Sequence, residues 1–116
     1  FTYVDDIVAG VAKVLDHPPE RGAEVALATP AGSTAPYRIY NIGNNEPVEL
    51  MRYIEVMQAA LGKRAILDRQ PMQQGDVVAT AADLTDLSGI IGFKPATSIE
   101  EGVPRFVQWY RDYYRA

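Results

Sequence analysis

The sequence contains no cysteine and only one histidine, and these two scarcities exclude several kinds of chemistry. Without cysteine, the chain can form neither disulfide bonds nor thiolate metal sites, which fits a reducing compartment such as the cytoplasm. His17 follows a predicted helix and has no neighbouring ligand, so neither a metal cluster nor a Ser-His-Asp triad is indicated. We expect His17 to be a solvated cation at that helix end.

Excess charge of one sign and long apolar runs are also absent. The formal net charge is −4 and the 11 basic residues are scattered, which argues against binding to nucleic acid or to an anionic membrane. No apolar run approaches the length of a membrane span, and no signal-peptide pattern opens the chain. We therefore expect a globular cytoplasmic protein that contacts neither nucleic acid nor membrane.

The length of 116 residues suits one domain but is small for an enzyme that also carries a dinucleotide. The chain begins at Phe1, without a starting Met, inside what already resembles a structural element. We therefore expect residues 1–116 to be a fragment of a longer protein.

The most informative stretch runs from Tyr37 to Leu61 and predicts a strand, a turn and a helix in that order. Aromatic and β-branched residues favour a strand over 37–42, and Gly43-Asn44-Asn45 breaks it. Apolar residues at helical spacing then predict a helix that ends at Gly62, near Lys63 and Arg64. A strand that leads directly into a helix is typical of an α/β fold, which tends to bind ligands at the turn.

Three further helices are predicted on either side of this stretch. Phe1–Val4 alternates like a short strand, and the helix after it begins with Asp5 and Asp6, which more often cap a helix than bind a metal. Its buried face is expected to comprise Ile7, Val11, Val14 and Leu15. Residues 18–36 form a long connection with a weak strand signal at Glu24–Thr29, and Ala65–Leu67 resembles another short extended segment.

The last two predicted helices have clear start and stop signals. Asp83 is expected to cap one helix, which Gly92 closes, and Leu84, Leu87 and Ile91 line its buried side. Gly89 and Gly92 lie at a helix end, so they do not form a dinucleotide loop. Ser98 to Glu101 is a capping box. The buried side of the final helix is expected to comprise Ile99, Val103, Phe106, Tyr110 and Tyr113, although Tyr113 and Tyr114 equally suit contact with a partner domain.

Polar groups gather on one predicted tight loop at 72–77. Gln73 offers both a donor and an acceptor, Gly75 permits close backbone approach, and Asp76 can accept hydrogen bonds from two hydroxyl groups. This combination suits recognition of a sugar or ribose. The alternative is that the loop is only a turn.

Four stretches, taken together, resemble one family: Phe1 to Gly10, Tyr37 to Asn44, Met72 to Val77, and Gly92 to Gly102. They are similar to the C-terminal portion of extended short-chain dehydrogenase/reductase nucleotide-sugar epimerases, most closely the UDP-glucuronate 4-epimerases. The resemblance covers nearly the whole chain, with the motifs in the family's order.

The resemblance implies the substrate-binding part of a Rossmann-type enzyme, with about four helices and a few short strands. The NAD-binding Rossmann domain, its glycine-rich loop and the catalytic Tyr-x-x-x-Lys belong to the part not resembled; none of the seven tyrosines here has a lysine four residues later. NAD is therefore expected in the full-length parent and not on this chain, which should not be active alone.

Carried over by position, Gln73 and Asp76 match the family loop that holds the ribose and diphosphate of the UDP-sugar, and Asn41 matches an amide contact near the diphosphate. Gln73 favours the glucuronate subgroup over the galactose subgroup, which has arginine there. Gln74 departs from the family's usual proline, so the loop is expected to be less rigid. For Asn41, a buried strand asparagine bonded to backbone is an equal alternative.

Two other functions remain open at this stage. The chain is alternatively a stand-alone oligomerisation or interaction module that pairs with a second copy through surfaces left by the missing domain. A third reading keeps the family but makes the parent a dehydratase, decarboxylase or reductase, whose distinguishing residues lie elsewhere. Weak UDP-sugar binding is the expected activity under the first reading.

Overall fold

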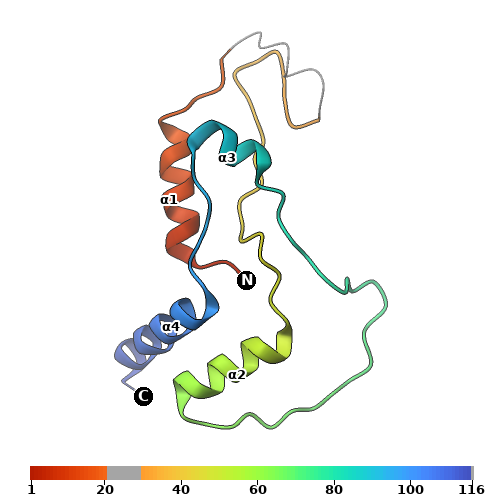
Figure 1. The fold of residues 1–116 in the computed structure, drawn as a ribbon, viewed down its shortest axis with the longest axis vertical. Helices are drawn as coiled ribbons and strands as arrows, with labels where there is room; N and C mark the ends of the chain where they lie inside the picture. The colour runs from red at the N-terminus through yellow and green to blue at the C-terminus, as the bar shows by residue number, and fades with distance from the viewer. Residues whose placement is uncertain (21–29, 116) are drawn as a thin grey trace. The chain divides into compact units, whose positions relative to one another are not determined.

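Four helices make up the regular structure of the computed structural model, which describes residues 1–20 and 30–115 (Figure 1). They are α1 (Val4–Leu15), α2 (Leu50–Leu61), α3 (Thr85–Ile91) and α4 (Ile99–Tyr114). The chain packs as two compact units. Unit 1 comprises Phe1, Glu46–Thr80 and Thr97–Ala116, and unit 2 comprises Thr2–Asn45 and Ala81–Ala96. The expectation of four helices is thus confirmed.

The short strands expected at 37–42 and 65–67 are not confirmed, because neither segment is a strand. The β pairing found within residues 1–20 and 30–115 is one isolated antiparallel bridge between Gly32 and Arg38. A strand needs a neighbour for its backbone groups, and segment 37–42 has one such contact instead of a ladder. The strand expected at Phe1–Val4 is wrong, because residues 1–3 have no regular structure and α1 begins at Val4. The strand signal at Glu24–Thr29 lies outside the described residues.

Unit 1 is built on a parallel pair of helices, α2 and α4. At their starts, Arg52 Nη2 lies 2.9 Å from Glu100 Oε1, and at their ends Arg111 Nη2 donates to the Leu61 carbonyl at 2.8 Å. Between these polar ties lies an apolar core of Val56, Val103 and Val107. Ion pairs as exposed as Arg52–Glu100 contribute little, so the buried valines, each worth about 1.5–3 kcal/mol, hold the pair together.

The exposed side of α4 corrects the predicted pattern of burial. Phe106, Tyr110 and Tyr113 are 49%, 42% and 67% exposed, whereas Val107, which the prediction left out, is buried. Val103 and Val107 face Val56 of α2, and Phe106 lies beside that side of the helix rather than on it. Tyr113 lies beyond Arg111, which already reaches the last residue of α2. The outer aromatic rings instead contact one another, Trp109 against Tyr113 and Tyr110 against Tyr114.

Ser98 is the N-cap of α4, as expected, but the reciprocal capping box does not form. The Ser98 side chain makes no hydrogen bond that caps the helix, and the Glu101 carboxylate pairs with Arg105 one turn later. The neighbouring Glu100 carboxylate accepts hydrogen bonds from its own backbone N–H and from Arg52, which lowers its pKa. Arg105 thus draws Glu101 away from the helix end, whereas the Glu100 carboxylate stays bonded to an N–H of the first turn.

Unit 2 contains α1, α3 and the segment between Tyr37 and Asn45. Its core is formed by Leu84, Leu87 and Ile91, the three residues expected on the buried side of α3. Tyr40, Ile42, Val14 and Phe93 are among the side chains that pack against this core. Gly92 ends α3 with a left-handed φ of 59°, as Gly62 ends α2 with a φ of 66°, so both predicted C-caps are confirmed.

The buried face of α1 was predicted only in part. Val14 packs on the core, but Val11 and Leu15 are 51% and 76% exposed. The closest contact is made instead by Gly10, where an added Cβ would lie 2.3 Å from Cδ1 of Ile42. A glycine therefore sets which side of α1 turns inward, because the helix approaches Ile42 closely where no side chain intervenes.

His17 lies at the end of α1 as expected, but the N-cap of α3 is Leu84 and not the predicted Asp83. His17 is exposed just beyond α1, and its Nδ1 lies 2.8 Å from the Lys13 carbonyl oxygen. Asp83 stands one residue before the N-cap of α3 and accepts hydrogen bonds from the Thr85 hydroxyl at 2.7 Å and the Thr85 N–H at 3.0 Å. These bonds lower the pKa of Asp83.

Within the described ranges, no helix has the length and apolar content that a membrane span requires.

Candidate functional site

The loop singled out by sequence is a well-defined β-turn in unit 1. The Asp76 N–H donates to the Gln73 carbonyl at 3.2 Å, and Gly75 has a φ of 96°. Among non-glycine residues of the described ranges, only Arg115 has a positive φ, so Gln74 lies in the ordinary negative region. A turn with a negative φ at its second residue and a positive φ at its third is a type II turn, which explains why the third residue is glycine.

The turn presents its polar side chains to solvent. Gln73 and Asp76 are both exposed. Among the described residues other than the two neighbours of Gly75, no atom lies within 4 Å of the position that a Cβ on Gly75 would occupy. An amide with a donor and an acceptor therefore stands three residues from a carboxylate, beside a backbone that another molecule can approach closely. Such a set can accept hydrogen bonds from two neighbouring hydroxyl groups and donate one to an anion.

Apolar side chains flank the turn on both sides. Met72, Val77 and Val78 are 64%, 69% and 89% exposed. An apolar border around a few polar groups is the usual composition of a small-molecule site, although here the surface is open rather than enclosed.

Asn41 belongs to unit 2 and is exposed, so the alternative of a buried strand asparagine does not hold. Its neighbours are fixed: Ile42 packs on the α3 core, and Gly43 is buried close to Ala82. The next backbone N–H, of Asn44, donates to the Thr2 hydroxyl at 2.8 Å. The fold thus holds the backbone on both sides of Ile42 while the Asn41 side chain stays accessible.

The structure therefore brings Gln73 and Asp76 together in one turn, and it places Asn41 in the other unit. Within the part of the chain that the structure describes, no group of histidine, cysteine or acidic side chains could hold a metal ion.

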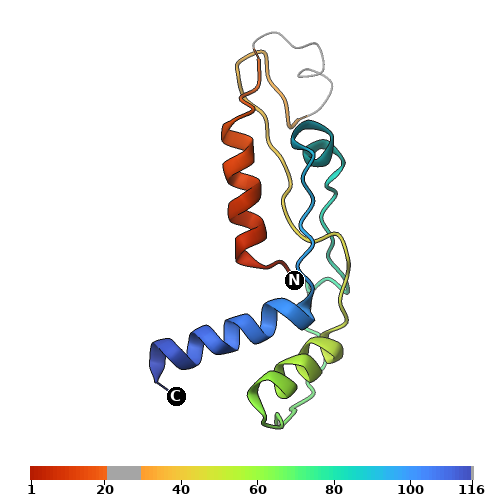
Figure 2. The same cartoon turned by 60° about the vertical axis from the view of Figure 1, so that its left-hand side comes forward.

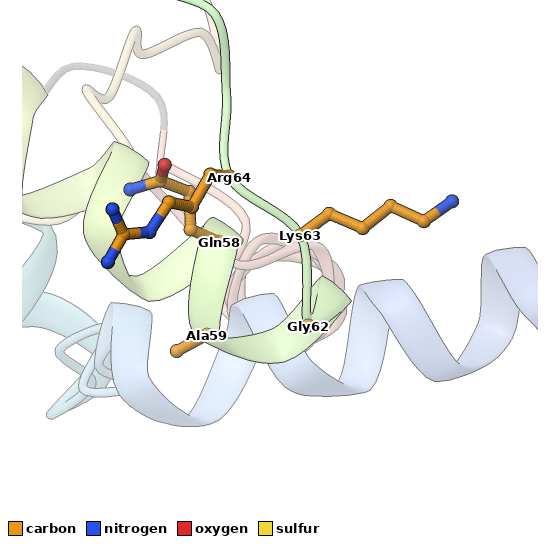
Figure 3. A pocket seen from close by; sticks show the side chains of 5 residues that line it. All are labelled: Gln58, Ala59, Gly62, Lys63 and Arg64. Atoms are coloured by element: carbon orange, nitrogen blue, oxygen red, sulfur yellow. The ribbon is translucent and has the colours of Figure 1, made fainter.

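A second polar hollow, which the sequence reasoning did not identify as a site, lies at the C-terminal end of α2 (Figure 3). It has a volume of about 460 Å³ and is lined by Gln58, Ala59, Gly62, Lys63 and Arg64. The Gln58 side chain accepts a hydrogen bond from Ala65 N–H at 2.8 Å, which fixes the chain as it leaves the helix. The sequence signal was the adjacent pair of cations after the helix-ending glycine.

The two cations of this hollow do not converge. Figure 3 shows the Lys63 side chain extended away from the other lining residues, whereas the Arg64 side chain lies beside Gln58. Tight recognition of a phosphate or carboxylate requires donors that point at one position. We therefore regard the turn at 73–76, and not this hollow, as the candidate site.

Comparison with known proteins gives several similar sequences and no matching protein-family model. "Protein CapI" of Staphylococcus aureus is 45% identical over 117 residues, which cover 99% of this chain and 35% of the relative. A "Probable UDP-glucuronate 4-epimerase" of Rhizobium meliloti (strain 1021) is 46% identical over 118 residues, with the same coverage of 99% and 35%. UDP-glucuronate 4-epimerase 1 of Arabidopsis thaliana is 36% identical, covering 98% and 26%. The chain thus spans about a third or less of the length of these relatives.

The fold is shared with a solved structure. "MoeE5 in complex with UDP-glucuronic acid and NAD" superposes with a TM-score of 0.71 over 97% of this chain and 33% of its own, at 24% sequence identity. At 24% identity, the similarity between this chain and that structure is evidence of a shared fold alone. The sequence relatives confirm the resemblance that the four motifs suggested.

Proposed function

Because this chain belongs to the nucleotide-sugar epimerases as the C-terminal part of such an enzyme, we propose that it supplies part of the UDP-sugar site of a 4-epimerase acting on UDP-glucuronate. The observation that carries the proposal is the exposed type II turn at 73–76, which displays an amide and a carboxylate around an unobstructed glycine. The solved neighbour of the same fold, a complex with UDP-glucuronic acid and NAD, is consistent with it.

Each residue of the turn has a distinct task in this proposal. The Asp76 carboxylate accepts hydrogen bonds from the two ribose hydroxyls, because an ionised carboxylate has only acceptor sites. The Gln73 amide donates toward the diphosphate, and Gly75 lets the nucleotide approach the backbone. Asn41 adds a second amide toward the diphosphate from unit 2.

The contribution of this chain to the reaction is positioning. In the parent enzyme, NAD supplies hydride acceptance and return at C4 of the hexose, chemistry for which this chain has no Tyr-x-x-x-Lys pair. Contacts with the UDP group are remote from C4, so their binding energy can orient the sugar without touching the reacting atom. A partner that completes the active site is therefore required for turnover.

An amide-resolved NMR titration of the chain with UDP, UDP-glucuronate and NAD, run in parallel, tests the proposal. Part of a site should bind UDP and UDP-glucuronate at around the millimolar level, worth roughly 4 kcal/mol. We expect chemical-shift changes at Gln73, Gly75 and Asp76 with both UDP ligands and none there with NAD. A folded chain that shows no change at these residues up to several times that level would refute it.

Matched substitutions separate site residues from general surface effects. Gln73→Ala and Asp76→Asn should abolish the UDP-dependent shifts, whereas Gln74→Ala and Asp68→Asn remove the same chemical groups from neighbouring positions and should leave them. Equal effects of all four variants would show that binding depends on loop charge and composition and not on the two proposed contacts.

A second candidate function, a stand-alone interaction module, is favoured by the aromatic surface of α4. Five aromatic side chains there are each at least 42% exposed: Phe106, Trp109, Tyr110, Tyr113 and Tyr114. Aromatic residues in such numbers are typical of protein interfaces. Concentration-dependent self-association that Trp109→Ser abolishes, together with no response to UDP, would favour this function. The same part of a dehydratase or decarboxylase would bind UDP-sugars in the same way, and activity of the complete protein separates these reactions.

A further inference from the structure

Burial alternates along the part of unit 2 that carries Asn41. Tyr40 and Ile42 pack on the α3 core, whereas Ile39 is 51% exposed and Asn41 is exposed as well. This alternation is typical of a chain whose successive side chains point to opposite sides. The contacts of Tyr40 and Ile42 therefore decide the side of the chain on which the Asn41 amide lies.

Beyond Ile42 the chain passes through a glycine. Gly43 is buried, and a Cβ added to it would lie 3.1 Å from the Cβ of Ala82, which itself packs on the α3 core. The close approach explains why this residue has no side chain. Glycine is also the residue with the greatest backbone freedom, so contacts made before it do not fix the chain that follows. A further contact is needed where the chain leaves Gly43.

The hydroxyl of Thr2 supplies this contact. Its Oγ1 accepts a hydrogen bond from the Asn44 N–H at 2.8 Å, and Thr2 directly precedes the N-cap of α1. The same helix reaches the segment a second time, where Gly10 approaches Ile42. Both views of the ribbon show α1 alongside segment 37–45 (Figures 1 and 2). The start and the middle of α1 thus hold the chain on both sides of the flexible glycine.

We propose that Thr2 is a positioning residue of the UDP-sugar site, because its hydroxyl holds the backbone after Ile42 and thereby keeps the Asn41 amide in its binding orientation. The inference rests on the proposed function, which gives Asn41 a contact near the diphosphate. Threonine suits the task, since its branched side chain has few rotamers and its hydroxyl stays directed at the Asn44 N–H. Thr2 and Asn41 are both exposed, so the hydrogen bond serves orientation more than stability.

Three substitutions in the 116-residue chain test the role of the hydroxyl. Thr2→Val keeps the branched shape but removes the oxygen that accepts the hydrogen bond, whereas Thr2→Ser keeps the oxygen. Thr34→Val is the matched control, since it makes the same chemical change at another exposed threonine of unit 2. Backbone ¹⁵N relaxation and an amide-resolved titration with UDP are recorded for each variant and for the wild type.

Relaxation shows whether the hydroxyl limits motion at Asn41. We expect the order parameters of the Asn41 and Asn44 N–H groups to fall in Thr2→Val from about 0.85, typical of a rigid backbone, toward about 0.6. The order parameter of Leu87 in the α3 core should stay unchanged, and Thr2→Ser and Thr34→Val should match the wild type. Unchanged order at Asn41 would overturn the proposal. Equal loss of order at Leu87 would also overturn it, since Thr2 would then support the whole unit.

The titration shows whether that motion matters for binding. If the Asn41 segment keeps its binding orientation for about a third of the time, the apparent affinity for UDP should fall about threefold in Thr2→Val. Gln73 and Asp76 should still respond to UDP, and Thr2→Ser should bind like the wild type. Wild-type affinity of Thr2→Val, or shifts at Gln73 and Asp76 without any at Asn41, would overturn this inference alone. Absence of shifts at all three residues in the wild type would refute the proposed function with it.

Discussion

Replacing Gln74 by proline should rigidify the candidate site and tighten UDP binding. Gln74 is the second residue of the type II turn, a position where proline is favoured because its fixed φ matches the turn. The hydrogen bond that closes the turn runs from Asp76 to Gln73, so proline at 74 removes no donor from it. The substitution also requires an extended conformation at Gln73.

The magnitude follows from the conformational entropy of the loop. A compatible change to proline is worth about 0.4–1 kcal/mol. If this free energy stabilises the turn conformation that binds UDP, the affinity for UDP should rise about two- to fivefold. The assay is the NMR titration of Gln73 and Asp76, fitted for the dissociation constant in the wild type and in Gln74→Pro.

Gly75→Ala supplies the opposite perturbation in the same turn. A side chain at a φ of 96° costs about 1–3 kcal/mol in backbone strain, so this variant should bind more weakly. If Gln74→Pro still formed the turn but bound UDP no more tightly than the wild type, loop flexibility would not be what limits UDP affinity. The reasoning from turn type to affinity would then be wrong.

Three further predictions concern stability and assembly. Leu87→Ala, at a side chain only 1% exposed, should lower the free energy of unfolding by about 2–5 kcal/mol in a denaturant titration, whereas Leu15→Ala, at 76% exposure, should change it by less than about 0.5 kcal/mol. Asp83→Ala should lower the melting temperature at neutral pH. Because the folded-state pKa of Asp83 is depressed, its contribution is complete above the ordinary carboxyl pKa and disappears as the pH falls through the lower folded value. The melting difference between wild type and Asp83→Ala should therefore vanish in strong acid, and a constant difference would contradict the assigned hydrogen bonds. Trp109→Ser should leave melting nearly unchanged, since its ring is 53% exposed, and a large loss would show that the aromatic rings stabilise α4.

The helices were predictable because their signals are local. Gly62 and Gly92 end α2 and α3 in the left-handed conformation that glycine adopts most readily, and Ser98 begins α4. Each of these signals depends only on residues within one or two turns.

Burial was less predictable, because it depends on what lies opposite. The helical spacing of Phe106 and Tyr110 suggested a buried side, but the residues of α4 that face α2 are Val103 and Val107. In α1, no local pattern indicated that Gly10 would make the closest contact, since this depends on Ile42, more than thirty residues away. The strand predictions were not confirmed for the same reason, because a β-ladder needs a second strand as its partner.

The candidate site was predictable in geometry but not in role. Residue types alone indicated a turn at Gln73–Asp76, and the φ of Gly75 confirms the need for glycine. The assignment of these side chains to ribose and diphosphate comes from family resemblance, and it remains a proposal. Nothing local identified Asn41, whose accessibility depends on how Ile42 and Gly43 pack.

The order in which the chain visits its two units limits how the protein can be divided. The chain leaves unit 2 after Asn45 and forms α2 in unit 1. It then returns to unit 2 to form α3, and it ends with α4 in unit 1. A cut between 45 and 46 would therefore separate Tyr40 and Ile42 from the α3 core against which they pack. Neither unit can be expressed as one continuous stretch of the gene, and the two are expected to tolerate exchange between relatives only together.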